Sequence, residues 1–444
     1  MFKLKLTPTQ VLVLGFASII LGGTLLLMLP ISCAAGHSTD FVSSLFTATS
    51  AVCVTGLIVV DTGTYWSIFG QVVIMLLIQA GGLGFMTMAT LISMMLGRRI
   101  GLKERLVIQE ALNEFSLQGL VKLIQRILIA TALFELSGMA LLATRFIPIY
   151  GIGKGLYYSL FHSVSAFNNA GFDIIGNFAS LTPFVGDVVI NFTIMGLIII
   201  GGIGFAVIMD IFYNWHVRRL SLHTKLVLTT TAILIAVGFL FFFCVEYNNP
   251  KTLGPLNTPT KALAALFQSI TPRTAGFNTI AEGDLTDASK FMTVLLMYTG
   301  ASPASTGGGI KTTTLATILL AVYAVLKGRD NVNIYGKRLS WTVVMRSLSI
   351  AVLALGLVSG VTIILSLVED QSFINVLYET TSAFGTVGLS TGITPSLSTV
   401  SRLALILTMF SGRVGPLTLA VALLQRQHGI KDLYKYPEEK IMVG

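Results

Sequence analysis

Eight long apolar runs divide the chain, and more polar connections separate them. The runs fall near residues 11–30, 67–97, 123–147, 187–213, 223–246, 290–327, 341–368 and 400–424. A helix needs about 20 mostly apolar residues to cross a bilayer, and the uncharged first run reaches that length. A cleavable signal peptide is the alternative for this run, because Lys3 and Lys5 precede it. Signal peptides, however, have a shorter apolar core of about 7–15 residues. We therefore expect eight membrane-spanning helices, the first included.

A similar string recurs four times between these runs. Each copy begins with leucine and an aromatic residue, continues with small and polar residues, and ends in a glycine followed by Leu or Phe. The copies are LFTATSAVCVTGL from Leu45, LFHSVSAFNNAGF from Leu160, LFQSITPRTAGFN from Leu266 and LYETTSAFGTVGL from Leu377. Their glycines are Gly56, Gly171, Gly276 and Gly388.

A glycine-rich stretch follows each string inside the next apolar run. QAGGLGF contains Gly82, IIGGIGF contains Gly202, STGGGIK contains Gly308, and Arg413 stands at this place in FSGRVGP. We predict an all-α membrane protein of four tandem repeats, each with a spanning helix, a re-entrant pore helix, a glycine-bearing segment and a second spanning helix. The predicted units are repeats at 1–97, 123–220, 221–330 and 331–424, a cytoplasmic amphipathic segment at 98–122, and a cytoplasmic tail at 425–444.

Four such repeats predict a pseudo-fourfold pore. Irregular backbone at membrane depth is tolerated only inside protein or facing water, and rings of backbone carbonyls can replace the hydration shell of a cation. Glycine permits a positive φ that turns these carbonyls. Glycines also serve helix packing, but four copies in equivalent places favour a filter. The candidate filter residues are Val52, Cys53, Val54, Thr55 and Gly56; Asn168, Asn169, Ala170 and Gly171; Thr274, Ala275 and Gly276; and Gly385, Thr386, Val387 and Gly388.

Composition and charge support this picture. The chain is 54% hydrophobic and 11% charged, with a mean hydropathy of +0.82, whereas soluble domains carry about 25% charged residues. A net charge of +9 is compatible with nucleic-acid binding, but the positive-inside rule explains it better. With both termini in the cytoplasm, the basic residues on the outer side are limited to Arg145, Lys154, Lys251, Lys261, Lys290 and Arg402.

Other function classes find little support. Three cysteines and five histidines are scattered, without the spacing of a disulfide framework or a zinc site. The stretch ASPASTGGGIKTTT fails the phosphate-loop pattern because Ile310 separates Gly309 from Lys311. The sequence shows no nucleophile–base pair of the kind that would indicate an enzyme. A secondary transporter with a midplane site remains the alternative, although four in-line repeats differ from two inverted ones.

These motifs resemble the Ktr/Trk/HKT superfamily of potassium transporters, and the chain is most similar to the membrane subunits of bacterial Ktr systems. The resemblance rests on SAVCVTGL, SAFNNAGF, ITPRTAGFN, SAFGTVGLS, GASPASTGGGIKTTT and SGRVGP, and it covers nearly all residues. Trk membrane subunits carry additional N-terminal spans, whereas the first repeat here begins near residue 11. The resemblance implies K+ uptake through the bacterial plasma membrane, with K+ held at the filter carbonyls.

The resemblance also implies selectivity for K+. Some plant relatives that permeate sodium have serine at the first filter glycine, where this chain has Gly56. Only GTVG, from Gly385 to Gly388, is close to the T-V-G-Y-G filter of potassium channels. We therefore expect looser selectivity than in a true potassium channel.

In the family, an intramembrane loop beneath the filter gates the pore, and an arginine lies near it. This implies a gate at 300–314, where Pro303 breaks the helix ladder. Arg413 is then either part of the barrier or an arginine neutralised by carbonyls at helix C-termini. The candidate gate residues are Gly300, Ala301, Ser302, Pro303, Ala304, Ser305, Thr306, Gly307, Gly308, Gly309, Lys311 and Arg413. Arg273 is expected behind the filter, paired with Glu379.

The resemblance finally implies partners. These are a second copy of the chain in a homodimer with one pore per chain, the lipid bilayer, and a cytosolic ring of nucleotide-binding regulatory subunits, with no nucleic acid. ATP or ADP would bind only to the regulatory partner, and Na+ is a possible activator. The segment 98–122 is interpreted as an interfacial helix or a docking face.

Overall fold

The computed structural model describes residues 7–84, 87, 106, 120–214 and 216–424. The predicted tail at 425–444 lies outside the described residues. So does the predicted amphipathic segment at 98–122, apart from Leu106 and residues 120–122.

A long helix followed by a short helix recurs along the chain. The long helices are α1 (Pro8–Leu27), α7 (Leu120–Tyr150), α11 (Leu222–Glu246) and α15 (Trp341–Val368). The short helices after them are α2 (Phe41–Val52), α8 (Ile152–Phe167), α12 (Thr258–Ile270) and α16 (Phe373–Gly385). Two further helices follow each long–short pair in the described chain. They are α3 (Thr62–Tyr65) and α4 (Ile68–Gly82), α9 (Val188–Ile203) and α10 (Phe205–Tyr213), α13 (Asp287–Tyr298) and α14 (Thr312–Leu326), and α17 (Thr399–Val414) and α18 (Pro416–Leu424).

Four or five helices in the described part of the chain are long and apolar enough to cross a membrane. In the described part of the chain, α1, α7, α11 and α15 meet the criterion, and a fifth span is gained if α9 and α10 count as one helix bent by 93°. The sequence predicted eight spans and a break only in the third repeat. Gly204 and Gly415, both at φ 96°, also interrupt the second and fourth repeats. This backbone conformation is unfavourable for residues other than glycine. We therefore attribute the two additional breaks to these glycines.

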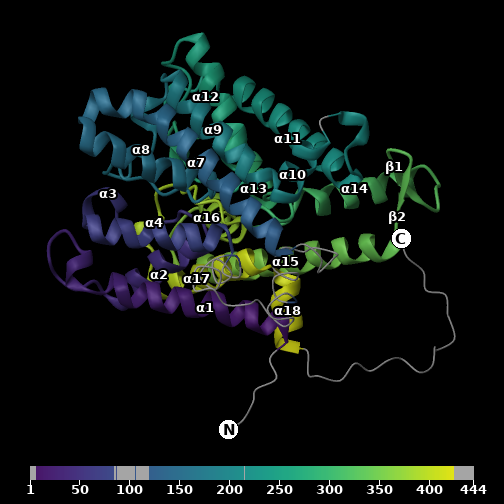
Figure 1. Cartoon of the computed structure of the whole chain (residues 1–444), viewed down its shortest axis with the longest axis horizontal. Coiled ribbons are helices and arrows are strands. Elements are labelled where there is room, and N and C mark those ends of the chain that lie inside the picture. Colours follow the sequence, from purple (N-terminus) through teal and green to yellow (C-terminus); the bar gives the residue numbers. More distant parts are fainter. Residues whose placement is uncertain (1–6, 85–86, 88–105, 107–119, 215, 425–444) are drawn as a thin grey trace, which may run out of the picture.

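A short β-hairpin accompanies the helices, which make up most of the described chain. Strands β1 (Val332–Ile334) and β2 (Lys337–Leu339) pair antiparallel between α14 and α15. Tyr335 and Gly336, both at positive φ, form the two-residue turn, as the tight connection of a hairpin requires. Figure 1 places the hairpin at one end of the molecule.

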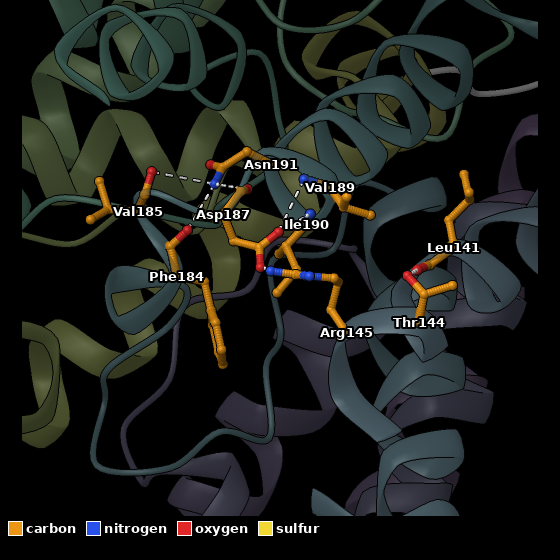
Figure 2. Close-up of polar contacts among 9 residues, drawn as sticks. All are labelled: Leu141, Thr144, Arg145, Phe184, Val185, Asp187, Val189, Ile190 and Asn191. Carbon is orange, nitrogen blue, oxygen red and sulfur yellow. Dashed lines mark hydrogen bonds and ion pairs between the residues drawn. The ribbon is translucent and has the colours of Figure 1, made fainter. Parts of the chain in front are cut away.

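Asp187 fixes the start of α9. Its carboxylate accepts hydrogen bonds from the backbone N–H groups of Val189 and Ile190 at 3.0 and 3.1 Å, which is the capping role favoured for Asp. The same carboxylate lies 2.7 Å from Arg145 Nε near the end of α7 (Figure 2). The cap therefore also connects two helices of the second repeat.

The short helix α16 occupies the middle of the molecule, with α1, α2 and α4 on one side and α7, α8 and α9 on the other (Figure 1). Glycines allow close packing against the ends of three of the short helices. A Cβ at Gly81, Gly201 or Gly412 would collide with the carbonyl oxygen of Val52, Phe167 or Phe384, which lie at or near the ends of α2, α8 and α16. Small residues let helix backbones approach in this way, and the same contact recurs in three of the predicted repeats.

Candidate functional site

Four glycines from distant parts of the chain form a closed ring. A Cβ built on Gly56 would lie under 3.0 Å from Ala170 O, and one on Gly171 would lie equally close to Ala275 O. A Cβ on Gly276 would likewise lie under 3.0 Å from Val387 O, and one on Gly388 would lie under 3.0 Å from Thr55 O. Because Thr55 belongs to the first string, the last contact closes the ring. The structure thus brings the four predicted filter strings together around one axis, in chain order.

The backbone of the strings repeats one unusual conformation. The four glycines have φ values of 90°, 67°, 82° and 90°. Two residues before each glycine stands another residue at positive φ, namely Val54, Asn169, Thr274 or Thr386. Such conformations cost about 1–3 kcal/mol for non-glycine residues and cluster at functional sites. The sequence pattern predicted positive φ at the glycines. It contained no signal for positive φ at the four residues that stand two positions before them.

The N–H groups of the strings point back to their own short helices. Thr55, Ala170 and Val387 donate from their backbone N–H groups to the carbonyl oxygens of Ser50, Ser165 and Ser382 at 2.7–2.9 Å. Gly56 and Gly388 donate to the hydroxyls of Ser50 and Ser382, both at 3.0 Å. Because their N–H groups are used on this side, the strings can present carbonyl oxygens to the axis. This donor set suits a hard monovalent cation.

Arg273 does not pair with Glu379, contrary to the sequence-based expectation. Its Nη2 donates to Thr231 Oγ1 at 3.2 Å. Glu379 instead accepts hydrogen bonds from Ser390 Oγ, Thr391 N and Thr394 Oγ1 at 2.7–2.8 Å. The neighbouring polar groups of the segment after Gly388 satisfy this carboxyl locally, so it does not need a distant arginine.

The segment between α13 and α14 lies directly against the strings. Gly308 N donates to Thr386 Oγ1 at 3.0 Å, and a Cβ at Gly307 would collide with Thr274 Oγ1. The side-chain amide of Asn169 and Thr306 Oγ1 are 3.1 Å apart. The segment therefore touches three of the four strings.

Hydrogen bonds hold this segment in a compact form. A bridge between Thr299 and Ile310 closes its base, and Lys311 Nζ donates to Gly307 O at 2.7 Å. Further contacts fasten it to the break in the second repeat: Ser302 N donates to Gly202 O, Thr306 N to Gly201 O, and Phe205 N to Ala304 O. Gly300, Ala301, Pro303, Ser305 and Gly309 lie in the same segment, which the sequence predicted as a gate.

Arg413 connects this segment to the first repeat. From the end of α17 its guanidinium donates to the carbonyl oxygens of Thr306, Gly81 and Gly82. The sequence left two interpretations open, a part of the gate barrier or an arginine neutralised by carbonyls at helix C-termini. Arg413 contacts both the loop and the carbonyls at the C-terminus of α4. Thr306 and Gly81, as its partners, carried no signal in the sequence.

Comparison with known proteins assigns the chain to a family. A family model described as TrkH, cation transport protein, matches residues 6–428. The chain belongs to the TrkH family. It is therefore a multi-pass membrane protein of a cation transport family, as the long apolar helices also indicate.

Relatives within this family match along almost their whole length. The chain is 44% identical to Ktr system potassium uptake protein B of Bacillus subtilis, over 99% of this chain and 97% of the relative. It is 39% identical to the protein of the same name from Vibrio alginolyticus, over 100% of this chain and 96% of the relative. It is also 39% identical to potassium/sodium uptake protein NtpJ of Enterococcus hirae, over 99% of this chain and 98% of the relative. The crystal structure of the potassium transporter TrkH from Vibrio parahaemolyticus has the same fold, with a TM-score of 0.74, 18% identity, and coverage of 95% of this chain and 86% of that one.

Proposed function

We propose that the chain is the ion-conducting subunit of a potassium uptake system. The observation that carries this proposal is the closed ring of four glycine-bearing strings, each presenting backbone to its neighbour. Relatives that match along nearly their whole length are named potassium uptake proteins, which supports K+ as the transported ion. K+ would pass between the filter carbonyls of four tandem repeats, each with two spanning helices and a re-entrant pore helix.

Selectivity would arise at the same ring. Carbonyl oxygens replace the hydration shell of the ion, and a Cβ at any of the four glycines would push the neighbouring carbonyl out of place. Glycine at all four positions therefore supports a K+-selective filter.

The gate in this proposal is the segment 300–314 together with Arg413. Supporting this role, the segment contacts three strings, and Arg413 connects it to α4. Deletion of residues 305–309 removes these contacts and should raise flux through the purified protein. A fall in flux of the folded deletion variant would contradict a barrier role.

The assembly would consist of two copies of this chain and a cytosolic ring of regulatory subunits that bind ATP or ADP. It would lie in a bacterial plasma membrane with the termini of each chain in the cytoplasm. The basic residues at the predicted inner connections support this orientation. The Enterococcus hirae relative is named a potassium/sodium uptake protein, which makes Na+ activation worth testing.

Rubidium flux into liposomes tests the function. Purified protein should admit Rb+ along its own gradient, faster than Na+, without a gradient of a second ion. Flux that requires a Na+ or H+ gradient would instead identify a coupled cation symporter. No Rb+ flux in either condition, even with a regulatory ring added, would refute the proposal.

A further inference from the structure

A buried carboxyl group lies behind the second filter string, outside the predicted filter and gate. Glu135 belongs to the long helix α7, whose neighbouring residues Leu133 and Leu136 are 67% and 60% exposed. Glu135 itself is only 9% exposed, so it faces the helix bundle. Ionisable residues inside membrane segments are costly and are usually retained for function.

The partners of Glu135 are two neutral amides. Asn168 Nδ2 donates to Glu135 Oε1 at 3.0 Å, and Gln79 Nε2 lies 3.4 Å from Glu135 Oε2. Asn168 Nδ2 also donates to Gln79 Oε1 at 2.8 Å. The three side chains thus form a closed triangle that joins α7, α4 and Asn168, the first candidate filter residue of the second string.

This triangle borders both parts of the proposed pore. Asn168 is fully buried and is the first of the candidate filter residues that run to Gly171. Its Oδ1 lies so close to Gly82 that a Cβ at this glycine would collide with it. The carbonyl oxygen of Gly82 in turn accepts a hydrogen bond from Arg413 Nη2 at 3.1 Å. Displacement of Asn168 would therefore disturb the filter backbone and the contact that Arg413 makes with α4.

We propose that Glu135 is a positioning residue for ion conduction, which orients Asn168 and Gln79 and thereby the second filter string. The inference rests on the proposed function, because it concerns the same pore. The carboxylate suits this place because it only accepts hydrogen bonds, and both amides can direct N–H groups at it.

The substitution Glu135→Gln tests this orientation at almost constant volume. Its new NH2 group would face the NH2 group of Gln79, so one bond of the triangle is lost. We expect the ratio of Rb+ to Na+ flux in liposomes to fall roughly five- to tenfold, the effect on an equilibrium of losing one buried hydrogen bond. Thr131→Val on the same buried face of α7 should keep the wild-type ratio, since no described partner binds the Thr131 hydroxyl.

The double variant Glu135→Gln with Gln79→Glu provides the rescue. It moves the carboxylate across the triangle and allows all three hydrogen bonds again, so the wild-type flux ratio should return. An unchanged ratio in the folded single variant, or no recovery in the folded double variant, would overturn the inference. If the single variant does not fold, Gln79→Ala replaces it and should lower the ratio in the same direction, because Asn168 loses its other side-chain acceptor. Absence of Rb+ flux in the wild type would instead count against the proposed function itself.

Discussion

Arg413 Nη2 lies 3.1 Å from the carbonyl oxygen of Gly82, so a guanidinium from the last repeat rests on the C-terminal end of α4 in the first. The same side chain also binds Thr306 O in the segment beneath the strings. Carbonyls at a helix C-terminus carry partial negative charge. One arginine therefore connects α17, the end of α4 and the segment between α13 and α14.

Substituting Arg413 should open the pore. Arg413→Gln removes the charge and at least two of the three carbonyl contacts, so the segment 300–314 loses its connection to α4. We expect a severalfold rise in Rb+ flux per folded protein in liposomes. Arg402→Gln is the matched control because Arg402 lies at the other end of the same helix and donates to Pro395 O. Equal flux in Arg413→Gln and wild type would argue against the barrier.

A side chain at Gly56 should lower selectivity. Gly56→Ser places a Cβ against Ala170 O in the neighbouring string, which should raise Na+ flux relative to Rb+ flux. Gly36→Ser is the control: Gly36 has φ 74°, close to the 90° of Gly56, but nothing within 4 Å of its Cβ position. Both substitutions carry the left-handed backbone cost of roughly 1–2 kcal/mol, so only the ring contact distinguishes them. A selectivity change in both variants would mean that strain alone is responsible.

The cap of α9 should contribute to stability (Figure 2). Asp187→Ala removes the carboxylate that accepts hydrogen bonds from two backbone N–H groups, together with the ion pair to Arg145. We expect a loss of about 1–2 kcal/mol. Asp187→Ser keeps a capping oxygen and should recover most of this loss. Thermal unfolding in detergent measures both variants. The side-chain exposure of Arg145 is 49%, so Arg145→Gln should cost much less than Asp187→Ala.

The C-terminal end of α15 should show a pH-dependent contribution from Glu369. Partial burial would raise the pKa of this carboxyl, but hydrogen bonds from Ser401 and Ser398 and the charge of Arg402 outweigh it, and the pKa is lowered. Ser398 N lies 2.9 Å from Glu369 Oε1. A folded-state pKa below the unfolded value means that the stabilisation is present above the unfolded pKa and is lost as pH falls through the folded pKa.

Glu369→Gln should therefore reduce stability by about 1 kcal/mol at neutral pH. Its difference from the wild type should shrink in acid. Unfolding temperatures between pH 7 and pH 3 measure this convergence, with Asp370→Asn as the control on the adjacent residue. A constant difference across this range would contradict the role of the ionised carboxylate.

Several features could be predicted from the sequence because they follow from local pattern. The recurrence of the four strings and the glycine at the end of each predicted where positive φ would be needed. Pro303 and the glycines after it predicted an interruption between α13 and α14. Apolar run length and charge asymmetry predicted a multi-pass membrane protein, and the match to the TrkH family confirms it.

Other features depended on contacts between residues far apart in the chain. The breaks at Gly204 and Gly415 were missed because glycines in an apolar helix usually serve packing. The pairing of Arg273 with Glu379 was wrong because polar groups of the segment after Gly388 satisfy that carboxyl. Glu135, Gln79 and Asn168 belong to different apolar or filter segments, and no spacing rule brings them together.

By itself the sequence determined the local features of the chain: apolar length, turn-permitting glycines and polar helix caps are all properties of short segments. Only the tertiary structure decided which carbonyl faces which, and which side chain rests on which helix end. The physical reason is that buried polar groups must find partners, and those partners become available only when four strings and their helices close around one axis.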